Sequence, residues 1–149
     1  MAESKTINSI FEAPSMKFFD YSKRLVSFSG KWRYDKQKGA MCTSKNLAKA
    51  GFVCTATKNE PDGAKCYVCQ HEMIWDPEDV PAVEHKKHRP DCELAKLDKP
   101  EEEYTIRDWL RLNAYVVSTQ QYDAIADSVA NLSAIMEKFV INTEKVMQG

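Results

Sequence analysis

Three cysteines and all three histidines of the chain lie within the 33 residues from Gly63 to Ala95. Cys66 and Cys69 are separated by two residues, a spacing at which the chain turns back and both sulfurs face one point. Cys92 and one of the histidines would bring the set of metal ligands to four. Three thiolates and one imidazole suit Zn²⁺, so the sequence predicts one zinc site in this stretch.

The spacing alone leaves the fourth ligand open between two histidines. His88 precedes Cys92 by four positions, as in the second half of an ordinary zinc finger, whereas His85 precedes it by seven. One helix cannot easily bring both His85 and Cys92 to one ion, because they would lie about 10 Å apart along its axis. Pro90 removes this objection, since it favours a break between two helices at Arg89. Both histidines remain candidates, and His71 is a weaker one.

Four protein ligands leave no position for a catalytic water, so the expected zinc is structural and the chain is not expected to be an enzyme. Cys42 and Cys54 have no partner at ligand spacing and are predicted to be buried thiols. A cluster of buried thiols without metal is the alternative, but the paired spacing favours the metal.

The composition is that of a soluble globular protein, with 149 residues, 43% hydrophobic and 29% charged residues, and a formal net charge of -1. Residues 1–100 carry 17 bases and 14 acids, whereas residues 101–149 carry four bases and eight acids. Neither balance predicts nucleic-acid binding, and "HKKHRPDC" is only a small basic patch. No apolar run approaches the ~20 residues of a membrane span, and no signal pattern begins the chain. We therefore expect a nuclear or cytoplasmic protein with reduced thiols.

The first hundred residues predict a small α+β unit with short elements. Residues 18–28 have an amphipathic helical pattern, and "TSKNLAKAGF" predicts a helix capped by Thr43 or Ser44 and ended by Gly51. Residues 52–56, 65–69 and 72–75 are short strand candidates separated by turns such as "NEPDGA".

The chain changes character at Pro100, because residues 101–148 contain neither glycine nor proline. Thr105 is a plausible N-cap, with Asp108 in a capping-box position three residues later. Apolar residues then recur in steps of three and four, which predicts a heptad seam interrupted by Thr143. The seam consists of Tyr122, Ile125, Val129, Leu132, Met136, Phe139 and Val146. An upstream stripe of Ile106, Leu110, Asn113 and Val117 lies out of register with it.

A helix over residues 105–147 would be on the order of 60 Å long, more than a small domain can cover. Two helices folded back as a hairpin are one interpretation, with "STQQYD" as the turn. We favour a single helix whose seam is completed by another chain, because no glycine or proline interrupts it.

These residues carry a resemblance to a known family. Arg24, "TSKNLAKAGF", the pattern Cys-x2-Cys-x15-His-x6-Cys, "WDPEDVP" and "EHKKH" together resemble the baculovirus inhibitor-of-apoptosis repeat, the BIR domain. A single repeat followed by a long helix, with no second repeat and no RING domain, is the arrangement of the survivin-like branch, and "YTIRDWLRLNAY" is similar to the start of its helix. The expected domains are an N-terminal segment (1–14), the BIR domain (15–98), a linker (99–104) and the helix (105–147).

The resemblance implies a short three-stranded antiparallel sheet with surrounding helices, and it selects His85 as the fourth zinc ligand. It also implies a non-enzymatic adaptor of a chromosomal passenger complex in chromosome segregation and cytokinesis. There the helix would bundle with inner centromere protein and borealin-like helices, and indirectly with Aurora kinase, at the centromere and spindle midzone. A homodimer is a further possibility.

The resemblance finally implies a groove that reads a histone tail with a free N-terminus and a phosphothreonine. By position, Asp79 would pair with the ammonium, Met73 and Trp75 would wall a methyl pocket, His88 would meet the phosphate and His71 would assist. The segment between Cys69 and His85 is one residue shorter than in survivin-like members, and Ile74 stands near an expected second acid.

Each groove assignment has a plainer alternative. Trp75 would also suit the core, Asp79 would suit the first turn of a helix, and His88 would suit any exposed position. Within the same fold, inhibition of caspases, or capture of their alanine-starting peptide antagonists, is the alternative function.

Overall fold

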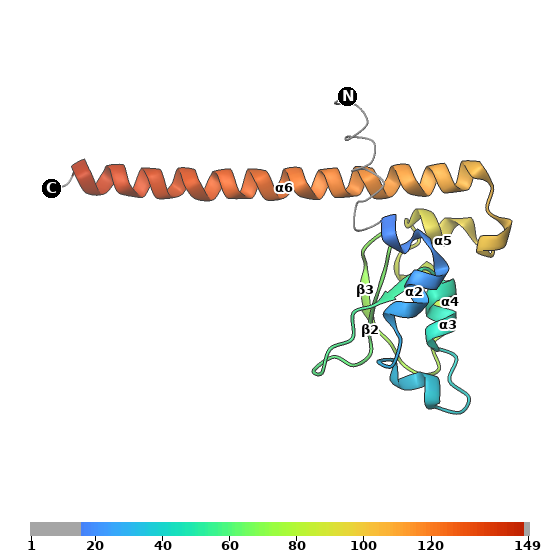
Figure 1. The fold of residues 1–149 in the computed structure, drawn as a ribbon. Coiled ribbons are helices and arrows are strands. Elements are labelled where there is room, and N and C mark those ends of the chain that lie inside the picture. Colours follow the sequence, from blue (N-terminus) through green and yellow to red (C-terminus); the bar gives the residue numbers. More distant parts are fainter. Residues whose placement is uncertain (1–15, 148–149) are drawn as a thin grey trace, which may run out of the picture. The chain divides into compact units, whose positions relative to one another are not determined.

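The computed structural model describes residues 16–147, and the side chains of residues 17–141. Its elements in chain order are the 3-10 turn η1 (Met16–Phe19), helix α2 (Tyr21–Ser27), η2 (Arg33–Lys36), α3 (Ser44–Lys49), strands β1 (Phe52–Cys54), β2 (Gly63–Cys66) and β3 (Glu72–Ile74), α4 (Pro81–His88), α5 (Glu93–Leu97), η3 (Glu101–Glu103) and α6 (Ile106–Met147) (Figure 1). The chain divides into two compact units after Val116. The predicted N-terminal segment, residues 1–14, lies outside the described residues.

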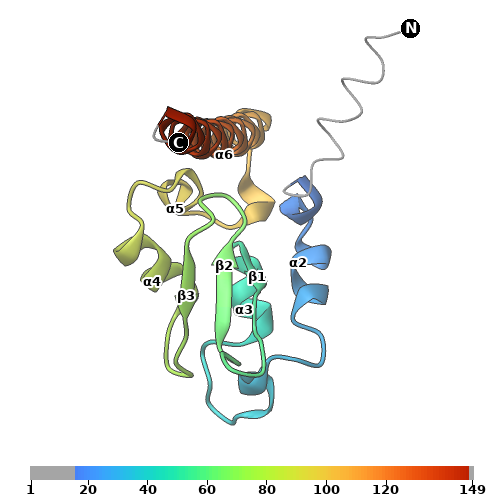
Figure 2. The same cartoon turned by 90° about the vertical axis from the view of Figure 1, so that its left-hand side faces the viewer.

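The sheet of the first unit is antiparallel with the order β1-β2-β3, as predicted. Phe52 pairs with Cys66 across β1 and β2, and Ala64 pairs with Met73 across β2 and β3. Figure 2 shows the strands side by side, with α2 packed next to β1. Each strand is shorter than its predicted range. Strands β1 and β3 end earlier than predicted, whereas β2 is shifted and begins at Gly63 instead of residue 65.

Aromatic side chains fill much of the core of this unit. Phe52 packs edge-to-face against Trp75, with ring centroids 4.8 Å apart, and Trp32 packs in the same way against Phe28 and Tyr34. The Tyr34 hydroxyl donates to the Trp75 carbonyl at 2.8 Å, so the polar end of a buried ring is satisfied. Such rings bury large areas, which is how a small sheet obtains a sufficient core.

Helix α3 begins and ends as its sequence predicts. Thr43 Oγ1 accepts from the Asn46 N–H at 3.3 Å, and the helix is followed by Gly51 at φ +87°. A side chain at Gly51 would overlap Leu94 as well as strain the backbone. Glycine is therefore required there by both conformation and space.

Arg24 is the buried charge that ties the first unit together. Its Nε donates to the Ala48 carbonyl and its Nη1 to the Phe18 and Phe19 carbonyls, while its Nη2 pairs with Glu101. Its guanidinium also lies 5.0 Å from the centroid of the Tyr67 ring. One side chain of α2 thus contacts η1, α3, η3 and the turn after β2.

We expect Arg24→Leu to destabilise the first unit by about 3–5 kcal/mol, because it leaves Glu101 and buried carbonyls without their partner. Chemical denaturation monitored by tryptophan fluorescence measures the change. Lys23→Leu is the matched control, since Lys23 is exposed on the same helix and is expected to be nearly neutral. Equal stability of the two variants would show that the Arg24 network contributes little.

The start of α6 confirms the predicted capping box. The Thr105 N–H donates to Asp108 Oδ2 at 2.8 Å, and the Asp108 N–H donates back to Thr105 Oγ1 at 3.2 Å. Lys99 also bonds this carboxylate at 2.6 Å. The Lys99 hydrogen bond, followed by those from Thr105, lowers the pKa of Asp108 to about 2.

One uninterrupted helix runs from Ile106 to Met147, so the alternative of a helical hairpin is not formed. Its first turns belong to the first unit, where Leu112 and Val116 are buried in the core. The predicted upstream stripe does not coincide with this buried face of the helix, because Ile106 is 79% exposed and Leu110 is 63% exposed. Within the described residues, no helix has both the length and the apolar character needed to cross a membrane.

Candidate metal centre

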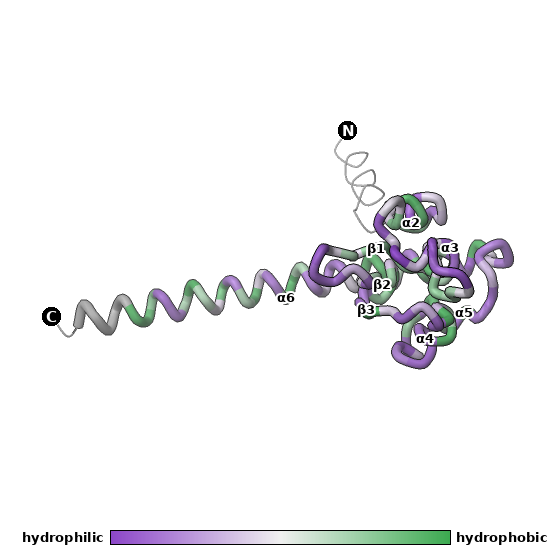
Figure 3. Tube along the Cα trace, turned by 90° about the horizontal axis from the view of Figure 1, so that it is seen from below, coloured by the Kyte–Doolittle hydropathy of each residue, from purple (hydrophilic) through white to green (hydrophobic). Residues whose placement is uncertain are grey.

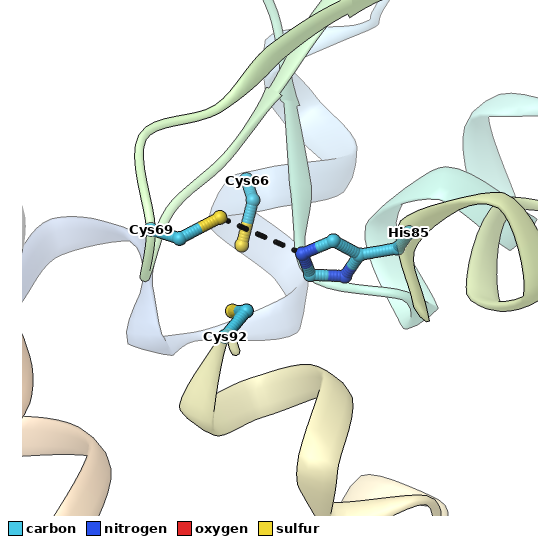
Figure 4. A group of neighbouring side chains, drawn as sticks. All are labelled: Cys66, Cys69, His85 and Cys92. Carbon is cyan, nitrogen blue, oxygen red and sulfur yellow. Dashed lines mark hydrogen bonds between the residues drawn. The ribbon is translucent and has the colours of Figure 1, made fainter. Parts of the chain in front are cut away.

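Four predicted ligands converge beside the end of the central strand β2 (Figure 4). They come from the end of β2, the turn after it, helix α4 and the N-cap of α5, and they are Cys66, Cys69, His85 and Cys92. One ligand atom of each lies within 4.8 Å of those of the others. The structure therefore brings together His85, and not His88, with the three cysteines.

The turn after β2 has the hydrogen bonds of a zinc knuckle. The Gln70 N–H donates to the Cys66 carbonyl at 3.0 Å, and Gln70 adopts φ +58°. The Val68 N–H donates to Cys66 Sγ at 3.4 Å, which stabilises a thiolate at that position. The chain thus reverses between the two cysteines and directs both sulfurs to one side.

The second pair of ligands depends on the predicted break at Pro90. Helix α4 ends at His88, and Arg89 has φ -136° and ψ 65°, outside the helical region. Cys92 is then the N-cap of α5. The break places His85 and Cys92 on two short helices, so their separation along a single axis no longer applies.

Burial and mutual hydrogen bonding perturb the pKa values of the cluster. Burial raises the pKa of the Cys66 thiol, whereas hydrogen bonds from Cys66 and Cys69 lower the pKa of Cys92. Burial alone would lower the pKa of His85, but its hydrogen bonds with Cys69 and Cys92 outweigh burial and raise the pKa to about 9.

The geometry fits zinc as the ion. The distance between Cys69 Sγ and His85 Nε2 is 3.6 Å. A tetrahedral ion with usual bond lengths to sulfur and nitrogen would place these two atoms about 3.5 Å apart. All five cysteines are free thiols, and Cys42 and Cys54 lie outside the cluster. Burial raises the pKa of Cys42 to about 12. Cys42 is thus the buried thiol that was predicted, whereas Cys54 is only half-buried.

The residues assigned to a peptide groove lie just before, within and after β3, which is an edge strand. Ile74 is 61% exposed, while Met73 and Asp79 are half-buried. The Asp79 carboxylate accepts from the Asp76 N–H at 2.8 Å and so closes the turn before α4. His88 Nε2 lies 3.4 Å from the Glu84 carboxylate, a contact that the i, i+4 spacing of the two residues could have indicated. His71 uses its carbonyl to accept from the Cys66 N–H.

Trp75 lies in the core and is 1% exposed. This is the alternative position that the sequence left open, and it differs from the expected place on the wall of a methyl pocket. Its ring packs on Phe52, which in turn lies against the His85 ring at 4.9 Å. Phe52 was not among the predicted site residues, because nothing in a strand of three residues indicates which side chain faces the metal ligands.

The predicted seam of α6 is exposed along the second unit. Its side chains Tyr122, Ile125, Val129, Leu132, Met136 and Phe139 are all exposed, as are Ile135, Val140 and Ile141. Figure 3 shows hydrophobic positions recurring between hydrophilic ones along this helix. The side chains of Thr143 and Val146 lie outside the described residues. An exposed apolar stripe of this length is typical of a protein-interaction surface.

Comparison with known proteins agrees with this geometry. The family model of the BIR, or Inhibitor of Apoptosis, domain matches residues 24–96. Baculoviral IAP repeat-containing protein 5.2 of Xenopus tropicalis is 33% identical over 119 residues, which cover 79% of this chain and 74% of that protein. The chain belongs to the BIR family.

Other members of the BIR family are similar over somewhat shorter lengths. Baculoviral IAP repeat-containing protein 5.2-B of Xenopus laevis is 40% identical over 67% of this chain and 65% of its own length. Chromosomal passenger complex protein bir-1 of Caenorhabditis elegans is 41% identical over 65% of this chain and 60% of its own length. The chain thus spans slightly less than two thirds of the length of these two relatives.

Proposed function

We propose that this BIR protein is a non-catalytic, zinc-stabilised adaptor of a chromosomal passenger complex that acts in chromosome segregation and cytokinesis. The observation that carries the proposal is the exposed apolar seam of α6, which follows a BIR domain in the same chain. The name of the similar protein bir-1 supports the same complex. Nucleus and cytoplasm, with centromere and midzone in mitosis, are the corresponding locations. Co-purification from mitotic cells with identification of the bound chains is the direct test.

One Zn²⁺, held by Cys66, Cys69, His85 and Cys92, would cross-link the sheet to α4 and α5. These four ligands would fill a tetrahedral coordination sphere and leave no position for water or substrate. The role of the metal is therefore structural, and the protein acts by binding.

The seam is the surface that would bind inner centromere protein and borealin-like helices, and Aurora kinase indirectly through them. Apolar side chains at positions three and four residues apart provide the knobs and holes of such a bundle. A second copy of this chain is the competing occupant, and the mass of the purified protein in solution distinguishes the two.

The edge strand β3 supports the second part of the proposal, the reading of a free histone N-terminus. An extended peptide can add to such an edge by main-chain hydrogen bonds. Asp79 would take the terminal ammonium, Met73 would contact the first side chain, and His88 and His71 would lie toward a phosphothreonine. Trp75 would support this surface from the core.

We expect Asp79→Asn to weaken binding of an alanine-starting histone peptide by about 10- to 100-fold, because a charge-assisted hydrogen bond contributes about 1.5–3 kcal/mol. Fluorescence anisotropy with a peptide labelled at its C-terminus measures the change. Glu78→Gln removes a neighbouring charge and serves as the control. A peptide with an acetylated N-terminus that binds as tightly as the free one would contradict ammonium recognition.

The family description itself favours a second candidate function, inhibition of caspases or capture of their alanine-starting antagonists. Direct inhibition assays with purified caspases decide between the two. Inhibition at stoichiometric concentrations would support this alternative, and its absence would leave the adaptor function.

A further inference from the structure

A cavity of about 510 Å³ lies between α3, the start of α4, α5 and the segment that precedes α6. All of these elements belong to the first unit. Apolar side chains make up most of its wall: Val80, Pro81, Ala82, Leu94, Ala95 and Tyr104. A cavity of this volume is in the range of small-molecule sites.

The charges of the cavity leave one cation without a partner. Asp98 pairs with Lys86 at 2.6 Å, and Lys99 pairs with Asp108 at 2.6 Å. The exposed side chain of Lys49, also a lining residue, makes no ion pair or hydrogen bond within the part of the chain that the structure describes. The cavity therefore has a net positive charge that comes from Lys49.

Two further donors belong to the same cavity. His85 lines it while being only 2% exposed. Its Nε2 faces Cys69, and its Nδ1 has no hydrogen-bond partner among residues 16–147. When Nε2 binds a metal, Nδ1 carries the proton and needs an acceptor. The N-terminus of α4 also opens here, because Val80 provides no side-chain cap and the Ala82 N–H, within the same described range, has no acceptor.

We propose that this cavity binds a small organic carboxylate with an apolar body. The carboxylate would accept from the Lys49 ammonium, His85 Nδ1–H and the Ala82 N–H, which together favour an anion. The apolar body would lie against Leu94, Ala95 and Tyr104. This site is separate from the edge strand β3 and from the seam, and the donor role of Nδ1 rests on the proposed zinc.

The test uses the zinc-loaded full chain and two probes with the same chemistry. Octanoate represents a free aliphatic acid, and N-acetyl-leucine represents the C-terminus of a peptide; N-acetyl-leucinamide lacks the charge. Calorimetric titration and ligand-observed saturation-transfer NMR measure the dissociation constants. Lys49→Gln is the variant, and Lys45→Gln on the same helix, outside the cavity, is the matched control.

We expect at least one acid to bind, the amide to bind at least tenfold more weakly, and Lys49→Gln but not Lys45→Gln to weaken the acid by about tenfold. The acid that binds more tightly identifies the source of the carboxylate. Equal binding of acid and amide, an unaffected Lys49→Gln variant, or no binding of either acid overturns the proposal. Metal content is measured for every variant, so loss of zinc is distinguished from loss of the carboxylate site.

Discussion

Replacing Cys92 by serine is expected to unfold the BIR domain. Cys92 is fully buried together with Cys66, and the two hold separate elements to one point. A serine hydroxyl does not ionise near neutral pH and is a poor zinc ligand, so the variant would lose the ion. Structural zinc provides about 10–16 kcal/mol of apparent binding free energy, which is as large as the whole stability of an ordinary domain, about 5–15 kcal/mol.

The expected result is a collapsed near-ultraviolet circular dichroism signal and loss of about one equivalent of zinc by elemental analysis. Chelator treatment of the unmodified chain should produce the same change, and added zinc should reverse it. Cys54→Ser is the control, because Cys54 is only half-buried and lies outside the cluster. A Cys92→Ser protein that keeps its fold without metal would show that the aromatic core is sufficient alone.

The metal cluster and helix ends were largely predictable because their signals are local. Cys66 and Cys69 are separated by two residues, which is the spacing of a zinc knuckle. Pro90 ends a helix, and Thr105 and Asp108 cap the start of another. Each of these effects depends on a few neighbouring residues. The choice of His85 over His88 was different. Spacing left both open, and the family resemblance selected the residue that the structure brings to the cluster.

Features that depend on tertiary packing were not predictable from the sequence. The local sequence around Trp75 would suit a surface position as well as a core position. Packing against Phe52, which is distant in the sequence, accompanies the placement of the ring in the core. The first turns of α6 contain two apolar stripes, and the packing of the first unit buries Leu112 rather than Leu110. The partners of Arg24 are carbonyls of η1 and α3 and the Glu101 carboxylate of η3, and no periodicity in the sequence indicates that these three segments meet.

Replacing three seam residues, Val129, Leu132 and Met136, by glutamine is expected to abolish co-purification of the helical partner. Burial of each such side chain contributes about 1.5–3 kcal/mol, so losing three corresponds to at least a thousandfold in the dissociation constant. The zinc content and the fold of the BIR domain should be unchanged, because these residues lie in the second unit. Pull-down followed by mass spectrometry measures the loss.

The matched control replaces Ala130, Ala134 and Lys138 by glutamine on the opposite side of the same helix. Retained partner in the seam variant, or equal loss in both variants, would contradict a specific seam. If the seam is covered by a second copy instead, the seam variant alone falls to the monomer mass in light scattering.

The residues that flank the seam are uncharged, and this predicts how association with the partner depends on salt. Gln121, Ser128 and Ser133 flank it, together with Ile135 and Val140, and none carries a charge. Interhelical ion pairs at such positions usually determine partner choice in coiled coils. Association should therefore depend on apolar packing and vary little with salt, since screening acts on charges. A tenfold weakening between 0.05 and 0.5 M salt would instead place the selecting contacts on the acidic residues outside the seam.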